Sequence, residues 1–270
     1  MYVDYHVHTE FSNDCNVPMQ EQCQAAIRAG VQQIAFTEHE ENNPKETLPF
    51  SFDHPAYLHE LARCRQELGA QLTIRAAIEI SEPHRYADAA ERVLSRYPWD
   101  FVLASLHWFD ADTNTNAREF FTRFGDWRES FRAYFREMLV MAQRGDFDVL
   151  AHLDYPARYA GRFIDGEYSI ALYEPEIRPV LQALIERGKG LEINSGGLRK
   201  QLPAACPPQI VVNWYREMGG QYLTVGSDAH LARDVGEGID VALRMARAAG
   251  FTAVTVYAQR CPTLLPIVGV

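Results

Sequence analysis

The chain has 270 residues, 47% of them hydrophobic and 11% aromatic, which is enough to bury one large core. Its formal net charge of −10 disfavours nucleic acid and anionic membrane surfaces as partners. No composition shift or low-complexity linker divides the sequence, so we expect a single domain over residues 1–270.

A short apolar run followed by a helical pattern recurs along the chain. The expected strands cover residues 3–7, 33–37, 72–79, 101–107, 148–153, 190–195, 222–228 and 252–257. Helical patterns lie between several of them, as at 18–29, 54–69 and 233–249. Strands that are apolar on both faces and alternate with helices predict a parallel sheet covered on each side.

Three further segments carry predictions about packing. The segments 40–53 and 108–117 are polar and rich in Pro or Asn, and they predict irregular loops that overhang the mouth of a binding site. One aromatic stripe has helical spacing and predicts a single helix face packed on the sheet. Its members are Phe120, Phe124, Trp127, Phe131, Tyr134 and Phe135.

The cysteines and the N-terminal residues indicate the cellular compartment in which the protein is expected. Five cysteines without a CxxC pair indicate neither a disulfide framework nor a thiolate zinc site. The first residues lack a signal-peptide pattern, and no apolar stretch approaches the ~20 residues of a membrane span. We therefore expect a cytoplasmic protein with reduced thiols.

Polar residues able to bind metal ions follow nearly every expected strand. They are His6, His8, Glu38, His39, Glu79, His107, His152, Asn194, Ser195, Asp228 and His230. In an open sheet only the strands at the switch point face a ligand, whereas a barrel brings all its carboxyl strand ends around one mouth. The pattern therefore favours a barrel of about seven or eight strands.

A metal centre is the economical explanation of these residues. A single histidine at a strand end is more often a hydrogen-bonded structural residue than a ligand. Here, however, six of the nine histidines lie at strand ends, and in His6-Val7-His8 the two-residue period turns both imidazoles to one face. Such closely packed buried groups need a cation between them. Glu10 and Glu38 could support the ligands or simply be solvated.

Several motifs together resemble a known family. They are DYHVHTEFS, AFTEH, SLH, FDVLAHLD followed by ARY, INSGGLRK and GSDAH, and they span nearly the whole chain. HxH, TEH and SDAH resemble the polymerase-and-histidinol-phosphatase (PHP) family of metallohydrolases, and SGGLRK with HLDYPARY resembles its monofunctional histidinol-phosphate phosphatase branch. The resemblance implies a distorted (β/α)7 TIM-like barrel with residues 252–257 as an extra element.

The resemblance also implies a trinuclear centre of divalent ions, which would be Mn, Fe or Zn. One ion would be bound by His6, His8, Glu79 and Asp228, a second by Glu79, His107 and His152, and a third by Asp14, His39 and His230. A hydroxide bridging two ions, held by Glu79 and Asp228, would be the nucleophile. Asp14 stands where histidine is also common in the family, and its carboxylate favours Mn or Fe over Zn at the third site.

Charge and two arginines point to a phosphate substrate. Three divalent ions and three carboxylates would leave about +3 at the mouth of an otherwise acidic protein. Arg158 and Arg199 are similar in position to the phosphate-binding arginines of the phosphatase branch, and their guanidinium groups suit phosphate oxygens. Gly196 and Gly197 fit a loop that approaches a ligand closely, or a simple turn.

The resemblance implies hydrolysis of L-histidinol phosphate to L-histidinol and inorganic phosphate in histidine biosynthesis. The alternatives are a phosphoesterase acting on another small ester such as a nucleotide, an amidohydrolase-type C–N hydrolase, and a non-catalytic PHP module. A C–N hydrolase has no need of two anion-binding arginines, and a non-catalytic module would have lost some of its ligands. The sequence patterns specify neither the oligomeric state nor the general acid.

Overall fold

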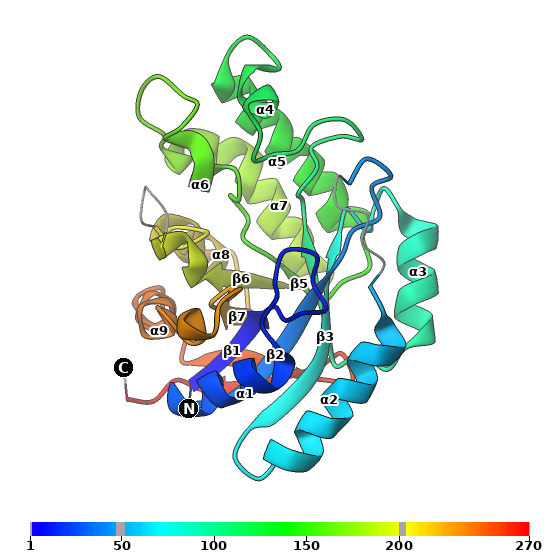
Figure 1. The fold of residues 1–270 in the computed structure, drawn as a ribbon. Coiled ribbons are helices and arrows are strands. Elements are labelled where there is room, and N and C mark those ends of the chain that lie inside the picture. Colours follow the sequence, from blue (N-terminus) through cyan, green and yellow to red (C-terminus); the bar gives the residue numbers. More distant parts are fainter. Residues whose placement is uncertain (1, 47–51, 200–203, 270) are drawn as a thin grey trace.

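The fold is built on seven parallel strands that follow one another in chain order around the molecule (Figure 1). The computed structural model describes residues 2–46, 52–199 and 204–269. The strands are β1 (Tyr2–Val7), β2 (Val31–Glu40), β3 (Thr73–Ser81), β4 (Phe101–Ser105), β5 (Val149–Leu150), β6 (Gly190–Asn194) and β7 (Leu223–Gly226).

Hydrogen bonds between the carboxyl end of β1 and the residues that follow β7 close the sheet on itself. The Asp228 N–H donates to the carbonyl oxygen of His6 at 2.7 Å, and the His8 N–H donates to that of Ala229 at 3.0 Å. The result is a nearly closed barrel, and the expected (β/α)7 TIM-like fold is confirmed.

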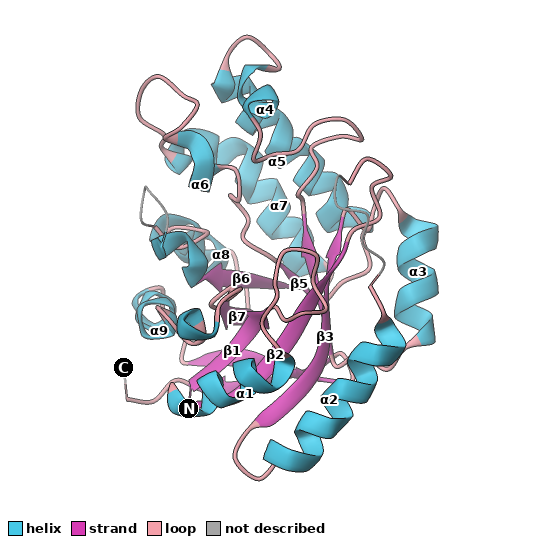
Figure 2. Ribbon diagram, in the orientation of Figure 1, coloured by secondary structure: helices cyan, strands magenta, loops and turns pink. Residues whose placement is uncertain are grey.

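Helices cover the outside of the barrel between consecutive strands (Figure 2). They are α1 (Met19–Arg28), α2 (His54–Leu68), α3 (Ala87–Arg96), α4 (Arg118–Thr122), α5 (Trp127–Arg144), α6 (Ala157–Ala160), α7 (Glu174–Glu186), α8 (Gln209–Glu217) and α9 (Ile239–Ala248). Short 3₁₀ helices add η1 (Ile170–Tyr173), η2 (Ser195–Arg199) and η3 (Ala232–Asp234). Within these ranges, no helix is long and apolar enough to cross a membrane.

Two helix predictions are wrong, and glycine is the reason in each. The helix expected at 233–249 begins only at Ile239, because Gly236 and Gly238 have φ values of +77° and +73°. The single aromatic helix is divided into α4 and α5 at Gly125, whose φ is +74°. Phe124 falls in this break and is 48% exposed, whereas the other members of the stripe are buried.

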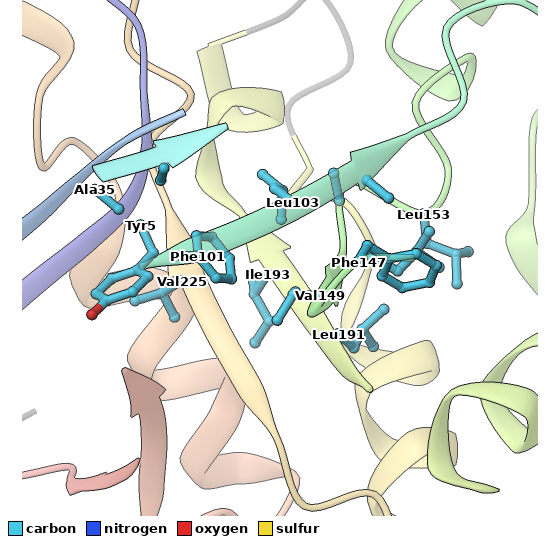
Figure 3. Packing of buried hydrophobic residues seen from close by; sticks show 14 of the residues in the cluster. Tyr5, Ala35, Phe101, Leu103, Phe147, Val149, Leu153, Leu191, Ile193 and Val225 are labelled. Atoms are coloured by element: carbon cyan, nitrogen blue, oxygen red, sulfur yellow. The ribbon is translucent and has the colours of Figure 1, made fainter. Parts of the chain in front are cut away.

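The interior of the barrel is filled by apolar side chains from the strands. Figure 3 shows Phe101 and Leu103 of β4 near Ile193 of β6 and Val225 of β7. Tyr5 packs edge-on against Phe101, with ring centroids 5.3 Å apart. Strands covered by helices outside and by each other inside are apolar on both faces, which explains the continuous runs in the sequence.

An antiparallel hairpin of β8 (Ala253–Ala258) and β9 (Cys261–Pro266) covers the amino ends of the barrel strands. The Arg260 N–H donates to the Asp100 carbonyl oxygen at 2.9 Å, directly before β4. Its guanidinium lies 3.0 Å from Asp148, directly before β5. The extra element expected at 252–257 is therefore present, and β9 is an addition to it.

The opposite end of the barrel is open and bordered by loops. The loops after β2 and β4 contact each other through Asn43 Nδ2 and the Ala111 carbonyl oxygen at 3.4 Å. They correspond to the expected irregular segments 40–53 and 108–117, of which residues 47–51 lie outside the described residues.

Candidate metal centre

A cavity of about 630 Å³ opens at the carboxyl ends of the barrel strands. Seven of the nine expected metal ligands line it: Asp14, His39, Glu79, His107, His152, Asp228 and His230. The other two, His6 and His8, are fully buried directly beneath. The barrel thus brings together residues from all parts of the chain that the sequence predicts to form one site.

Glu79 lies at the centre of the histidines. One of its carboxylate oxygens, Oε1, is 2.9 Å from His152 Nε2 and 3.6 Å from His107 Nε2. The other oxygen, Oε2, is 3.1 Å from His39 Nδ1 and 3.4 Å from His6 Nε2. One oxygen thus faces two histidines expected at the second ion, and the other faces His6, expected at the first, and His39, expected at the third.

His6 and His8 converge as the strand period predicts. Their Nε2 atoms are 3.1 Å apart, and each is 3.6 Å from Asp228 Oδ1. Asp228 has a φ of +56°, a left-handed conformation that non-glycine residues rarely adopt. The buried carboxylate of Asp4 secures this turn by accepting hydrogen bonds from the Ser227 N–H at 2.8 Å and the Gly236 N–H at 2.9 Å.

A third group of candidate ligands, Asp14, His39 and His230, lies at the rim of the cavity. Asp14 is 3.2 Å from His230 Nε2 and 3.5 Å from His39 Nε2, and its side chain is 47% exposed. These three residues are the set expected for the third ion.

The donor set fits divalent metal ions. Glu79 Oε2, His39 Nδ1 and His230 Nε2 are buried, and none of their contacts with the described residues, including those at 3.1 and 3.2 Å, has the geometry of a hydrogen bond. Four groups have ligand atoms within 4.8 Å of one another: His6–His8–Asp228, His6–Glu79–His152, His39–Glu79–His107 and His8–His39–His230. Imidazole and carboxylate donors crowded in this way suit Zn²⁺, Mn²⁺ or Fe²⁺.

Glu79 and His8 have the charge states that metal binding requires, whereas four other histidines favour their protonated forms. Burial would raise the pKa of Glu79, but His6 and His39 hold it well below its usual range. Burial, together with His230 and His39, lowers the pKa of His8 to about 3. A charged carboxylate and a neutral imidazole are the forms that bind a metal ion. Burial would lower the pKa of His6, His39, His107 and His230, but the carboxylates around them raise it, so a metal ion would displace their protons.

Further residues hold the ligands from behind, and the sequence patterns did not single out most of them. His6 Nδ1 is 2.7 Å from Glu192, His8 Nδ1 is 3.0 Å from Ser12, and His107 Nδ1 is 2.8 Å from Glu41. Glu192 precedes Asn194 by two residues on β6, so strand alternation places both side chains on the inner face. That alternation is the signal that could have identified it.

The sequence left two roles open for Glu10 and Glu38, either support of the ligands or solvation, and the structure distinguishes the two residues. Glu38 is fully buried and accepts hydrogen bonds from Ser12 and Thr9, whereas Glu10 is exposed. Burial raises the pKa of Glu38 to about 7, and the hydrogen bonds from Ser12 and Thr9 favour its charged form. Glu38 therefore supports the site and Glu10 is solvated.

Both predicted arginines line the cavity on the β5–β7 side. Arg158 is buried in α6, with Nη1 2.7 Å from Asp228 Oδ2 and Nη2 2.6 Å from Asn194 Oδ1. Arg199 donates through Nη2 to the Ser227 carbonyl oxygen at 2.7 Å. Two guanidinium groups are thus held beside the carboxylate cluster, and groups of this kind can bind the oxygens of an anion.

Gly196 also lines the cavity, and space rather than backbone conformation requires it. A Cβ atom there would lie 2.9 Å from Asn194 Oδ1 and 3.0 Å from the Asp228 Cβ. A side chain at this position would therefore displace a candidate ligand.

A parallel barrel with histidines and carboxylates at the carboxyl ends of its strands is the architecture of a metal-dependent hydrolase. The family model for the PHP domain matches residues 4–196. The chain belongs to the PHP domain family.

Individual relatives cover almost the whole chain. The histidinol-phosphatase of Lactococcus lactis is 28% identical, over 92% of this chain and 91% of its own length. A probable histidinol-phosphatase of Clostridium acetobutylicum is 30% identical, over 91% and 93%. The crystal structure of histidinol phosphate phosphatase from Lactococcus lactis, complexed with zinc, L-histidinol and phosphate, superposes with a TM-score of 0.88 at 25% identity, over 97% of this chain and 98% of that one.

Proposed function

We propose that this protein is a metal-dependent phosphomonoesterase that hydrolyses L-histidinol phosphate to L-histidinol and inorganic phosphate. The observation that carries the proposal is that one cavity joins the histidine and carboxylate cluster to the guanidinium groups of Arg158 and Arg199. The relatives named histidinol-phosphatase, which match over more than nine-tenths of the chain, support this substrate.

Three divalent ions, which would be Mn, Fe or Zn, are part of the proposal. The residues that would hold them are His6, His8, Asp14, His39, Glu79, His107, His152, Asp228 and His230. Bound there, the ions would act as Lewis acids and lower the pKa of water to about 7.

The side chains then divide the work of hydrolysis. Arg158 and Arg199 bind the phosphate oxygens and neutralise the charge that develops on them in the transition state. The carboxylates of Glu79 and Asp228 face the centre and orient the attacking water as hydrogen-bond acceptors. Water attacks phosphorus opposite the ester oxygen, the P–O bond to that oxygen breaks, and the proton that the water loses ends on the departing oxygen of L-histidinol. No covalent phosphoenzyme is needed.

We further propose that residues 1–270 form one functional domain. The PHP model ends at residue 196, but β7 and Asp228 follow it and complete both the barrel and the ligand cluster. A cytoplasmic role in histidine biosynthesis belongs to the same proposal.

The decisive experiment is steady-state phosphate release from L-histidinol phosphate, compared with a panel of nucleotide and sugar phosphates. The protein is loaded separately with Mn²⁺, Fe²⁺ and Zn²⁺. We expect the highest kcat/KM for L-histidinol phosphate and loss of turnover on chelation. Activity confined to other phosphates would reject the substrate, and no phosphatase activity with metals bound would favour C–N hydrolysis or a binding module.

A further inference from the structure

Ser12 lies at a junction of three polar groups behind the metal centre. Its hydroxyl is 2.6 Å from Glu38 Oε2 and 3.0 Å from His8 Nδ1, and it accepts the backbone N–H of His39 at 3.1 Å. Ser12 is 3% exposed and Glu38 is fully buried. Water therefore has little access to this junction.

The direction of each hydrogen bond follows from counting protons. The backbone N–H of Thr9 is a fixed donor to Glu38 Oε2 at 3.0 Å, so this oxygen is an acceptor whether or not Glu38 carries a proton on Oε1, which lies 2.7 Å from the Thr9 hydroxyl. Ser12 has a single hydroxyl proton, and it donates this proton to Glu38 Oε2 in the short hydrogen bond. His8 Nδ1 must then donate its own proton to the Ser12 oxygen.

This direction determines the lone pair of His8. A neutral imidazole with its proton on Nδ1 has its lone pair on Nε2. The Nε2 atom of His8 faces Asp228 Oδ1 at 3.6 Å and His6 Nε2 at 3.1 Å. The lone pair therefore points at the place where the ligand atoms converge.

We propose that Ser12 and Glu38 are positioning residues that fix the Nδ1-protonated tautomer of His8 and so reserve its Nε2 for a divalent metal ion. The inference rests on the metal centre of the proposed function, but not on the substrate. Through Thr9 and Ser12, Glu38 also secures the turn that precedes Asp14. One buried carboxylate therefore organises two candidate ligands.

Other histidines in the cluster are held differently, which provides a matched control. Ser81 contacts His107 Nδ1 at 3.0 Å, as Ser12 contacts His8. His107 Nδ1 also has Glu41 as a direct acceptor at 2.8 Å, whereas the described contacts of His8 Nδ1 include only Ser12. Loss of the serine hydroxyl should therefore leave His8 Nδ1 without an acceptor, whereas His107 Nδ1 keeps Glu41 as its acceptor.

The test compares Ser12→Ala with Ser81→Ala and with the conservative variant Ser12→Thr. Nitrogen-15 NMR of histidine-labelled, metal-free protein reports the tautomer of His8. Titration with Zn²⁺ against a chromophoric chelator reports the affinity and number of bound ions. Neither readout uses a phosphate ester, so both are independent of the substrate assignment.

We expect Ser12→Ala to lose the Nδ1-protonated signal of His8 and to weaken one Zn²⁺ ion by about 10- to 100-fold. Ser12→Thr should restore both, and Ser81→Ala should change neither by more than about threefold. An unchanged His8 signal in folded Ser12→Ala would overturn the proposal, as would equal loss of Zn²⁺ in both alanine variants. Thermal unfolding of each variant separates these effects from misfolding.

Discussion

At the scale of single residues, Arg158 has two contacts that depend on the shape of its side chain. Its Nη1 and Nη2 reach different acceptors, Asp228 Oδ2 and Asn194 Oδ1, and its guanidinium lies over the Tyr155 ring with 5.3 Å to the centroid. A lysine ammonium is a single point charge on a flexible stem and cannot make these contacts together. The charge alone is therefore not sufficient at this position.

We predict that Arg158→Lys raises KM for the phosphate ester at least about tenfold, because a lysine ammonium cannot keep the contacts with Asp228 and Asn194 and also donate to a phosphate oxygen. Steady-state kinetics with the metal-loaded enzyme measures this. Arg162→Lys is the matched control, since Arg162 is exposed and lies in the same segment. Equal kinetics for the two variants would remove Arg158 from the phosphate site.

At the scale of elements, the hairpin at the amino end of the barrel ends in an unpaired edge. Within the described residues β9 pairs only with β8, and Leu264 on it is 55% exposed. Because Ala258 and Cys261 flank the two-residue turn, residues 262, 264 and 266 direct their backbone groups away from β8. Pro262 and Pro266 have no N–H to offer there, so they protect the edge against pairing with another chain.

We predict that the double variant Pro262→Val, Pro266→Val self-associates more strongly than the wild type, because the edge regains two outward N–H groups and two β-branched side chains. Sedimentation velocity over a concentration series measures this. The control is Thr263→Val, which adds apolar surface to β9 without restoring an outward N–H. A double variant that sediments like the wild type at every concentration would show that the prolines do not protect this edge.

At the scale of the whole molecule, the two ends of the barrel have different tasks. The carboxyl end carries the candidate ligands, of which Glu79, His39, His152 and His230 each have a buried oxygen or nitrogen without a hydrogen bond to the described part of the chain. The amino end is fastened by the hairpin, where Arg260 contacts both Asp146 and Asp148 at 2.7–3.0 Å. Ligand chemistry at one end and anchoring at the other is the usual division in such barrels.

We predict that Zn²⁺ or Mn²⁺ raises Tm of the metal-free protein, by the equivalent of about 2.7 kcal/mol at 100-fold the Kd. Arg260→Ala should lower the stability of both forms by about 1–3 kcal/mol, because Asp148 stays buried without its partner. Since the two sites lie at opposite ends, the effects should add. Calorimetry of the wild type and of Arg260→Ala, each with and without the metal ion, tests this. A metal-induced rise in Tm that disappears in Arg260→Ala would show that the two ends of the barrel are not independent.

Much of the site could be predicted because it follows from local rules. The two-residue period of a strand places His6 with His8, and parallel strands in a barrel bring their carboxyl ends to one mouth. For the same reason the alternation of apolar runs and helices predicted the fold class. Boundaries were less accurate, because Gly125 and Gly238 interrupt patterns that look continuous by hydrophobicity alone.

The sequence by itself therefore determined which residues gather at the mouth, since residue type and strand period are local properties. Only the tertiary structure decided how they are grouped and held, because those contacts depend on closure of the barrel. His6 and Glu192 are 186 residues apart in the sequence and 2.7 Å apart in space. The same closure directs His8 to Ser12 and places Arg158 against Asp228. No local pattern encodes such distances, because they arise from the packing of the whole barrel.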